Sequence, residues 1–166
     1  MKATGIVRRI DDLGRVVIPK EIRKTLRIRE SDPLEIFTDR EGEIILKKYS
    51  PIGELGSFAK QYAESLAQTT GHSICITDRD QIIATAGGVK RDYVGRPISG
   101  SLESLIEERE NVMHNLTDKE HVDILEVNEE KRAQVISPIL CEGDAIGAVV
   151  LMGKNDKVRM GETEQI

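Results

Sequence analysis

The sequence predicts two domains: a mostly β domain over residues 1–50 and a larger α+β domain over residues 51–166. Three observations predict this organisation. Short runs of β-branched residues, separated by turn residues, fill most of the first domain, whereas from Ile52 onward the apolar residues recur at helical spacing. The formal charge also changes sign: residues 1–29 hold nine Lys or Arg and three Asp or Glu, a charge of +6, and the rest of the chain holds 15 basic and 26 acidic residues, a charge of −11. Opposite charges indicate two parts with different partners, the first of them suited to a polyanion.

The first domain opens with two predicted strands joined by a turn. Residues 4–10 and 15–18 are rich in Ile and Val, as strands are. Between them, residues 11–14 (Asp-Asp-Leu-Gly) are a turn signal, because Asp tolerates the left-handed region and Gly adopts it without strain. Pro19 ends the second strand because it has no N–H to donate, and it also suits the first position of a helix.

A short helix and a second hairpin complete the first domain. The helix is predicted over residues 20–26, with Ile22 and Leu26 on its buried side. Residues 34–38 and 43–47 are then predicted to pair across a turn. About 50 residues in the order β-β-α-β-β bury little apolar surface alone. We therefore expect two chains to interleave their strands in a dimer, which would also cover the open strand edges.

The second domain is predicted in the order α-β-β-α-β-β. Its first helix covers residues 52–68 and ends before Gly71. The charged stretch 117–132 has no clear period, and residues 161–166 have the composition of a helix start. The other predicted elements are hairpin strands at 73–77 and 81–86, a helix at 102–112, and hairpin strands at 133–140 and 145–152.

Five basic residues of the first domain are the candidate DNA-binding residues. They are Arg8, Arg9, Arg15, Arg23 and Lys24. Pairing across the first turn would bring Arg8 or Arg9 close to Arg15, and the helix would present the other two away from its buried side. Grouping like charges costs electrostatic energy that a polyanion relieves, and the guanidinium fork matches both phosphates and base edges. A merely solvated basic face is the alternative, which the local concentration of charge in an acidic chain disfavours.

Residues 1–50 resemble the AbrB-type, swapped-hairpin DNA-binding domain of bacterial transition-state regulators. The matching runs are Thr-Gly-Ile-Val-Arg at 4–8, Asp-Leu-Gly-Arg-Val-Val-Ile-Pro at 12–19, Ile-Arg-Lys-Thr-Leu at 22–26 and Ile-Ile-Leu-Lys-Lys-Tyr at 44–49. The resemblance implies that two chains interleave their hairpins into a homodimer and that the five basic residues bind double-stranded DNA. Lys24 stands where close relatives often have Arg, and Arg27 stands where they often have Gly.

The whole chain also resembles a two-domain member of that family in which the second part is a GAF-type domain. This resemblance implies a sequence-specific activator and repressor of sporulation genes that lies in the cytoplasm, on the nucleoid of the forespore. It also implies a homotetramer, in which helices flanking the GAF-like sheet pair between dimers. The candidate oligomerisation residues form one apolar stripe: Leu55, Phe58, Tyr62 and Leu66. The alternative is that this stripe only covers its own sheet.

The second domain shows no motif that identifies a ligand. Backbone N–H groups of the run Gly-Gly-Val-Lys-Arg at 87–91 would suit an anion, and a flexible loop is the alternative. An unidentified small-molecule ligand is therefore left open, and no cofactor is expected. The three histidines have no metal spacing with either cysteine, so no metal site is expected. Cys75 and Cys141 lie in strand-like runs and are expected to be reduced, partly buried thiols.

Enzymes and membrane proteins are disfavoured as classes. The sequence holds no nucleophile elbow, phosphate loop or zinc helix, so no catalytic residues are expected. No apolar run approaches the roughly 20 residues that cross a bilayer, and no signal peptide is visible, which favours the cytoplasm. A MazE-like antitoxin or another protein-interaction module is the alternative function. In such antitoxins a disordered tail comes after the shared fold. In this chain a domain with regularly spaced apolar residues comes after it.

Overall fold

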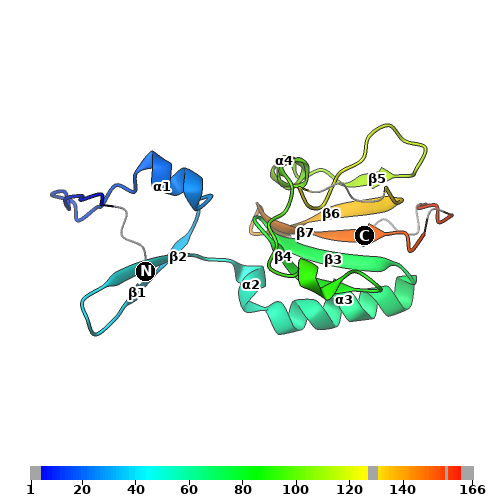
Figure 1. Cartoon of the computed structure of the whole chain (residues 1–166), viewed down its shortest axis with the longest axis horizontal. Helices are drawn as coiled ribbons and strands as arrows, with labels where there is room; N and C mark the ends of the chain where they lie inside the picture. Colours follow the sequence, from blue (N-terminus) through cyan, green and yellow to red (C-terminus); the bar gives the residue numbers. More distant parts are fainter. Residues whose placement is uncertain (1–4, 127–130, 156, 162–166) are drawn as a thin grey trace. The chain divides into compact units, whose positions relative to one another are not determined.

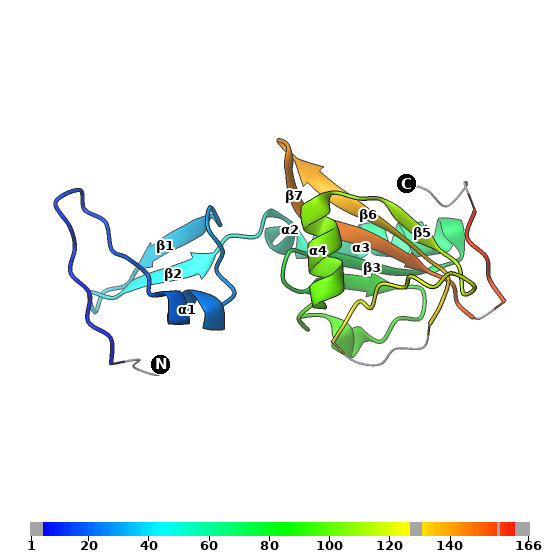
Figure 2. The same cartoon turned by 90° about the horizontal axis from the view of Figure 1, so that it is seen from above.

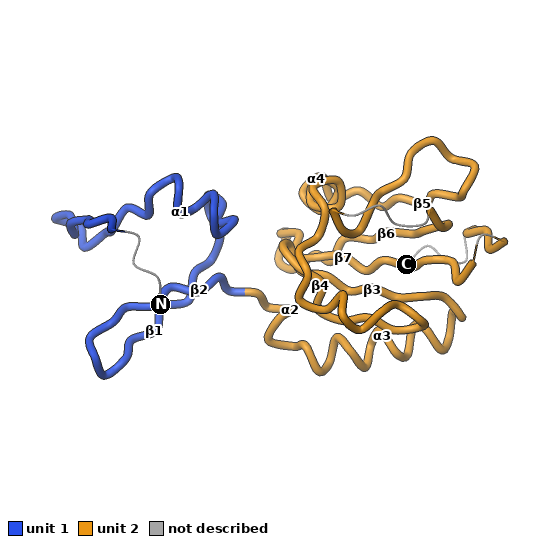
Figure 3. Tube along the Cα trace, in the orientation of Figure 1, with its two compact units in different colours: residues 1–49 blue, residues 50–166 orange. Residues whose placement is uncertain are grey.

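The structure is a computed structural model that describes residues 5–126, 131–155 and 157–161. The chain divides into two compact units, residues 1–49 and residues 50–166, coloured blue and orange in Figure 3. Each unit is described by itself.

Unit 1 (residues 1–49) contains one short helix and one hairpin. Helix α1 (Lys20–Thr25) is followed by strands β1 (Leu34–Thr38) and β2 (Ile44–Lys48), which pair antiparallel. The turn between the strands is held by Asp39, whose carboxylate accepts from the N–H groups of Glu41 and Glu43 at 3.0 and 2.9 Å. The predicted helix and second hairpin are thus confirmed, with ends that shift by one residue.

The two strands predicted at 4–10 and 15–18 do not form in this single chain. Thr4 lies outside the described residues, and residues 5–19 contain a turn but no strand. Their apolar side chains are left in solvent, with Val7 88 % and Val17 69 % exposed. The physical reason is the lack of a partner: a two-stranded hairpin that packs on nothing gains too little from pairing to hold its ladder.

Unit 1 has almost no interior of its own. Pro19 is the one buried residue among those that the structure describes in this unit. Leu26, predicted on the buried side of α1, is 57 % exposed, and Ile22 is half-buried. A chain segment without a core cannot offset the entropy of ordering it, so this unit requires apolar surface from outside itself.

Unit 2 (residues 50–166) begins with two helices where one was predicted at 52–68. Helix α2 (Pro51–Glu54) ends at Leu55, and helix α3 (Gly56–Thr70) follows at once. Gly71 ends α3 as predicted, because its φ of +74° lies in the left-handed region that glycine adopts without strain.

A five-stranded antiparallel sheet forms the centre of unit 2 (Figure 1). Its strands are β3 (Ser73–Asp78), β4 (Ile82–Ala86), β5 (Val112–His114), β6 (Gln134–Cys141) and β7 (Asp144–Met152). The spatial order is β4-β3-β7-β6-β5. Both predicted hairpins, β3 with β4 and β6 with β7, are confirmed. The pairing of β3 with β7 joins the two hairpins at the middle of the sheet.

The second predicted helix is shorter than expected and is followed by a strand. After the 3₁₀ turn η1 (Arg91–Tyr93), helix α4 covers Gly100–Glu108 and ends at Arg109, which has a φ of +58°. The helix predicted over 102–112 is therefore wrong at its end, because Val112 belongs to β5 and pairs with Ile136.

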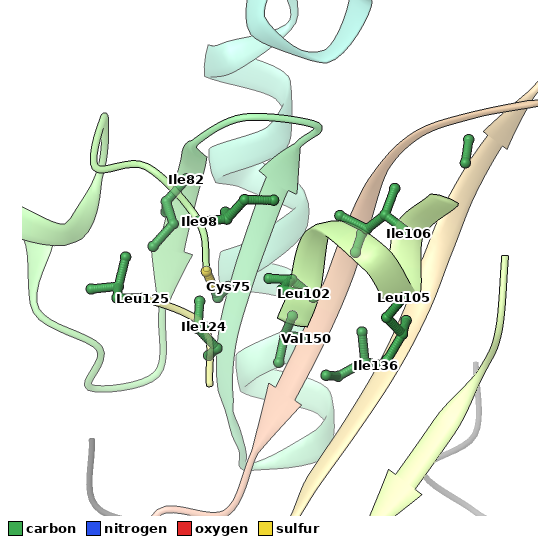
Figure 4. Packing of buried hydrophobic residues seen from close by; sticks show 12 residues of the cluster. Cys75, Ile82, Ile98, Leu102, Leu105, Ile106, Ile124, Leu125, Ile136 and Val150 are labelled. Atoms are coloured by element: carbon green, nitrogen blue, oxygen red, sulfur yellow. The ribbon is translucent and has the colours of Figure 1, made fainter. Parts of the chain in front are cut away.

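Helix α3 covers one face of the sheet, with Ile52 of α2 in the same core, and α4 covers the other face (Figure 2). Figure 4 shows the core on the α4 side, where Leu102 of the helix lies close to Cys75 and Val150 of the sheet. Neither cysteine forms a disulfide; Cys75 is buried, but Cys141 is exposed, which corrects the expectation that both are partly buried.

Two segments singled out in the sequence lie partly outside the described residues. Residues 127–130 of the charged stretch and 162–166 of the helix start predicted at 161–166 lie outside the described residues. No helix within the described ranges is long and apolar enough to cross a membrane.

Candidate nucleic-acid interface

The first predicted turn is built around the side chain of Asp11. Its Oδ1 accepts from the N–H groups of Leu13 at 3.0 Å and Arg15 at 2.8 Å, and its Oδ2 accepts from the Arg15 guanidinium at 2.8 Å. The backbone closes around the same residues: Asp11 N–H donates to the Arg15 carbonyl, and Gly14 N–H donates to the Asp11 carbonyl, both at 3.0 Å. Gly14 has a φ of +76°, as the turn requires.

These hydrogen bonds favour the ionised form of Asp11. The Arg15 N–H, and then the Arg15 side chain and the Leu13 N–H, lower the pKa of the Asp11 carboxyl below its ordinary value. The carboxylate is therefore charged at neutral pH and orients the Arg15 side chain, which stays 68 % exposed. Arg15 is thus held in place beside the turn of residues 5–19, a segment that we call the arm, and its remaining donors face solvent.

Arg8 and Arg9 lie on the part of the arm that precedes the Asp11 turn. Both are exposed, and neither forms an ion pair with another described residue. Because residues 5–10 form no strand here, the cross-strand approach of Arg8 or Arg9 to Arg15 is not seen in the single chain. The three arginines share one arm, whose chain reverses at the Asp11 turn (Figure 2).

Arg23 and Lys24 occupy the last turn of α1, where cations interact favourably with the helix dipole. Lys24 is exposed, whereas Arg23 is half-buried. The helix ends tightly: Ile28 N–H donates to the Arg23 carbonyl at 2.8 Å, and Arg27 adopts a φ of +53°. Glycine would adopt this left-handed position without strain.

The link from α1 to the hairpin is anchored by Lys48, a basic residue that is not among the candidates. Its ammonium group donates to the Arg27 carbonyl at 2.7 Å and pairs with Asp32 at 3.4 Å. Next to it, the Lys47 ammonium group lies 4.8 Å from the centre of the Phe37 ring. Two adjacent lysines at the end of a predicted strand are the feature of the sequence that could have indicated these two cations. They extend the positive charge of unit 1 onto β2.

In unit 2, three of the four candidate oligomerisation residues lie on the solvent side of the first helices. Leu55, Phe58 and Tyr62 are each 55–58 % exposed. The Phe58 and Tyr62 rings contact each other, with centroids 5.4 Å apart. Leu66 is instead half-buried and packs against the core beneath α3. The stripe therefore divides, with Leu66 facing its own sheet and the other three forming an uncovered apolar patch.

Two family models match the chain, one on each part. The model described as stage V sporulation protein T C-terminal, transcription factor, matches residues 54–166. The model described as the antidote-toxin recognition MazE, bacterial antitoxin, matches residues 7–54.

Curated relatives from Bacillus subtilis (strain 168) match over the same parts. Stage V sporulation protein T is 56 % identical over 165 residues, which cover 99 % of this chain and 90 % of that protein. The transition state regulatory protein AbrB is 67 % identical over 51 residues, 31 % of this chain and 52 % of AbrB. Among solved structures, the N-domain of the transcription factor AbrB is 67 % identical, covers 31 % of this chain and 96 % of its own, and has a TM-score of 0.28.

Proposed function

The chain belongs to the stage V sporulation protein T family, and on this basis we propose that it is a DNA-binding transcription regulator of sporulation genes. Unit 1 grips duplex DNA as a dimer, and unit 2 assembles the dimers into a larger complex. As a sequence-specific activator and repressor it would work in the cytoplasm, on the nucleoid of the forespore.

The observation that carries the DNA-binding proposal is the exposed basic surface of unit 1 in a chain whose net charge is −5. Arg15 is oriented by Asp11, and Lys24 is exposed at the end of a helix. Phosphate contacts require positively charged side chains that are held in place and still have N–H groups to donate. Arginine can also form hydrogen bonds to the edge of a guanine base. In the proposed interface Arg8, Arg9, Arg15, Arg23 and Lys24 all face DNA.

The apolar surface of unit 1 supports a dimer in which hairpins are exchanged between chains. Residues 5–19 carry β-branched side chains in solvent and form no strand alone. A second copy would supply both the missing strand partners and the missing core, which is the swapped-hairpin arrangement. Dimerisation also places two sets of cations on one surface, as a two-fold DNA site requires.

Unit 2 supports assembly beyond the dimer. We propose that its sheet is GAF-like and that the patch of Leu55, Phe58 and Tyr62 packs against the same patch of another dimer, giving a homotetramer. An exposed apolar patch with aromatic side chains is typical of a surface that a partner subunit covers.

The antitoxin alternative is weaker. The MazE model matches only residues 7–54, and an ordered sheet domain follows it where antitoxins carry a disordered segment. Co-purification of a small toxic protein with the chain would support it.

The salt dependence of DNA binding tests the proposal. If each of two subunits places four or five cations near phosphates, the logarithm of the association constant should fall with the logarithm of salt concentration at a slope on the order of −5 to −8. Fluorescence anisotropy with labelled duplex DNA at several salt concentrations measures the slope, and a slope near zero would refute the proposal.

A further inference from the structure

Unit 2 has a groove whose lining does not include the apolar patch of Leu55, Phe58 and Tyr62. It has a volume of about 530 Å³ and is lined by residues of β4, of α3 and of the loop 87–94. Sites for small molecules typically measure about 300–1,000 Å³, so the size suits a metabolite. Strand β4 is the last strand of the sheet on this side, and its residues beyond Ile82 line the groove.

The loop that forms the rim of the groove is tethered at both ends. At its start, Ser73 Oγ donates to the Gly87 carbonyl at 2.8 Å, and a Cβ on Gly87 would come 2.2 Å from the His72 carbonyl oxygen. After the loop, Gly95 N–H donates to the Ile82 carbonyl at 2.8 Å, and Ile82 N–H donates to the Arg96 carbonyl at 3.0 Å. The wall that η1 contributes is thus fixed before anything binds, which lowers the cost of binding.

The lining combines apolar side chains with charges. Ile83 and Val94 contribute apolar surface, and Val94 is 47 % exposed. The charged side chains that line the groove are Lys60, Glu64 and Arg91. Lys60 reaches Glu64 only at 4.0 Å across an exposed pair, which contributes little. Arg91 is exposed and has no ion-pair partner among the described residues, so the lining carries one uncompensated positive charge.

We propose that this groove binds a small organic anion, whose apolar body covers Ile83 and Val94 and whose acidic group is held by Arg91 and Lys60. An apolar wall with a free guanidinium group is the chemistry that recognises an amphipathic carboxylate, since the fork of Arg91 accepts a carboxylate in two places. Glu64 opposes the anion and sets a limit on its charge.

Calorimetry with three probes tests the chemistry on the full chain. Hexanoate carries both an apolar body and a carboxylate, 1-hexanol carries the body without the charge, and inorganic phosphate carries charge without the body. Hexanoate is expected to give saturable binding that is at least about tenfold tighter than either of the others. Absence of saturable hexanoate binding, or equally tight binding of 1-hexanol or phosphate, overturns the proposal.

Three single variants locate the site. Arg91→Gln should weaken hexanoate binding about tenfold, because it removes a charge-assisted hydrogen bond. Glu64→Gln should tighten binding, because it removes the opposing carboxylate. Lys119→Gln, an exposed change outside the groove, is the matched control and should leave binding unchanged. Thermal melting confirms that each variant folds. If a folded Arg91→Gln protein binds as the unchanged chain does, the groove is not the site.

Discussion

Ser50 Oγ donates a hydrogen bond to Asp78 Oδ2 at 2.9 Å, which joins the first turn of α2 to the end of β3. The same serine oxygen accepts from Gly53 N–H at 3.0 Å and so caps the helix. The other oxygen of Asp78 accepts from the N–H groups of Asp80 and Gln81, both at 2.8 Å. One carboxylate, only 5 % exposed, therefore holds the start of unit 2 and the β3–β4 turn together.

Removal of this carboxylate should destabilise unit 2. Asp78→Ala removes a charged acceptor of three hydrogen bonds and is expected to lower the free energy of unfolding by about 2–3 kcal/mol. Ser50→Ala removes only the cap and one donor, so about 1 kcal/mol is expected. Urea denaturation followed by circular dichroism measures both. Thr69→Ala, on the exposed side of α3, is the control and should change the stability by less than about 0.5 kcal/mol. Equal losses from Asp78→Ala and Thr69→Ala would contradict the role of the carboxylate.

The turn at Asp11 should respond to acid. Because the pKa of Asp11 is lowered in the folded turn, chiefly by the Arg15 N–H, the ionised carboxylate stabilises the turn above its ordinary pKa of 3.8. That contribution is lost as the pH falls through the lowered pKa. An NMR titration of the Asp11 carboxyl carbon should give a midpoint below 3.8. Arg15→Gln keeps the backbone donor and removes the ion pair, so it should move the midpoint only part of the way back. A midpoint at or above the ordinary value would mean that the turn is not formed in solution.

Local patterns in the sequence predicted most of the elements. The β1–β2, β3–β4 and β6–β7 hairpins follow from alternating apolar runs around turn residues, and the end of α3 follows from Gly71. Two predictions were wrong for different reasons. Apolar spacing runs through Leu55 without showing that the chain divides α2 from α3 there. Val112 fits a helical period as well as a strand, and only its pairing with Ile136 decides.

Charge and motif predicted candidate DNA-binding residues, but they did not predict the geometry around them. Charge and motif indicate Arg15, yet its ion pair with Asp11 depends on a turn in which the aspartate accepts three hydrogen bonds. The strands expected on either side of that turn depend on a partner chain, which no pattern within one chain supplies. Likewise the Ser50–Asp78 contact spans 28 positions and carries no periodic signal.

Substitution of single cations should weaken DNA binding without loss of fold. Arg15→Ala and Lys24→Ala are each expected to cost about 1–3 kcal/mol of binding free energy, because both side chains are exposed and pack on little. Arg23→Ala should cost a similar amount, with a larger effect on stability because Arg23 is half-buried. Anisotropy titrations at fixed salt measure binding, with Lys119→Ala in unit 2 as the control. Melting curves that collapse together with binding would identify these residues as structural.

A charge in the apolar patch of α3 should limit assembly. Tyr62→Glu places a carboxylate beside Phe58 on a surface that we propose is buried between dimers, where an unpaired charge is costly. Light scattering of the full chain should show a mass near four chains, and the variant should fall to two. Glu64→Gln, an exposed change on the same helix, is the control and should keep the larger mass. A full chain that is already a dimer at micromolar concentration would refute the tetramer.

Loss of unit 2 should weaken DNA binding through loss of avidity alone. A chain that ends after Ser50 keeps every candidate cation and every side chain proposed for the swapped dimer, so it should still bind DNA as a dimer. In the proposed tetramer, engagement of the second dimer would be intramolecular at an effective concentration in the millimolar range, which would raise the apparent affinity by as much as roughly 10²-fold. The truncated chain should therefore bind more weakly by up to that factor, and Tyr62→Glu in the full chain should lose a similar amount, since both interrupt the same link. Anisotropy titrations with duplexes that hold one or two sites separate the causes: the loss should appear on the two-site duplex and be small on the one-site duplex. If the truncated chain binds the two-site duplex as tightly as the full chain does, unit 2 adds nothing to affinity, and its role would then be regulatory.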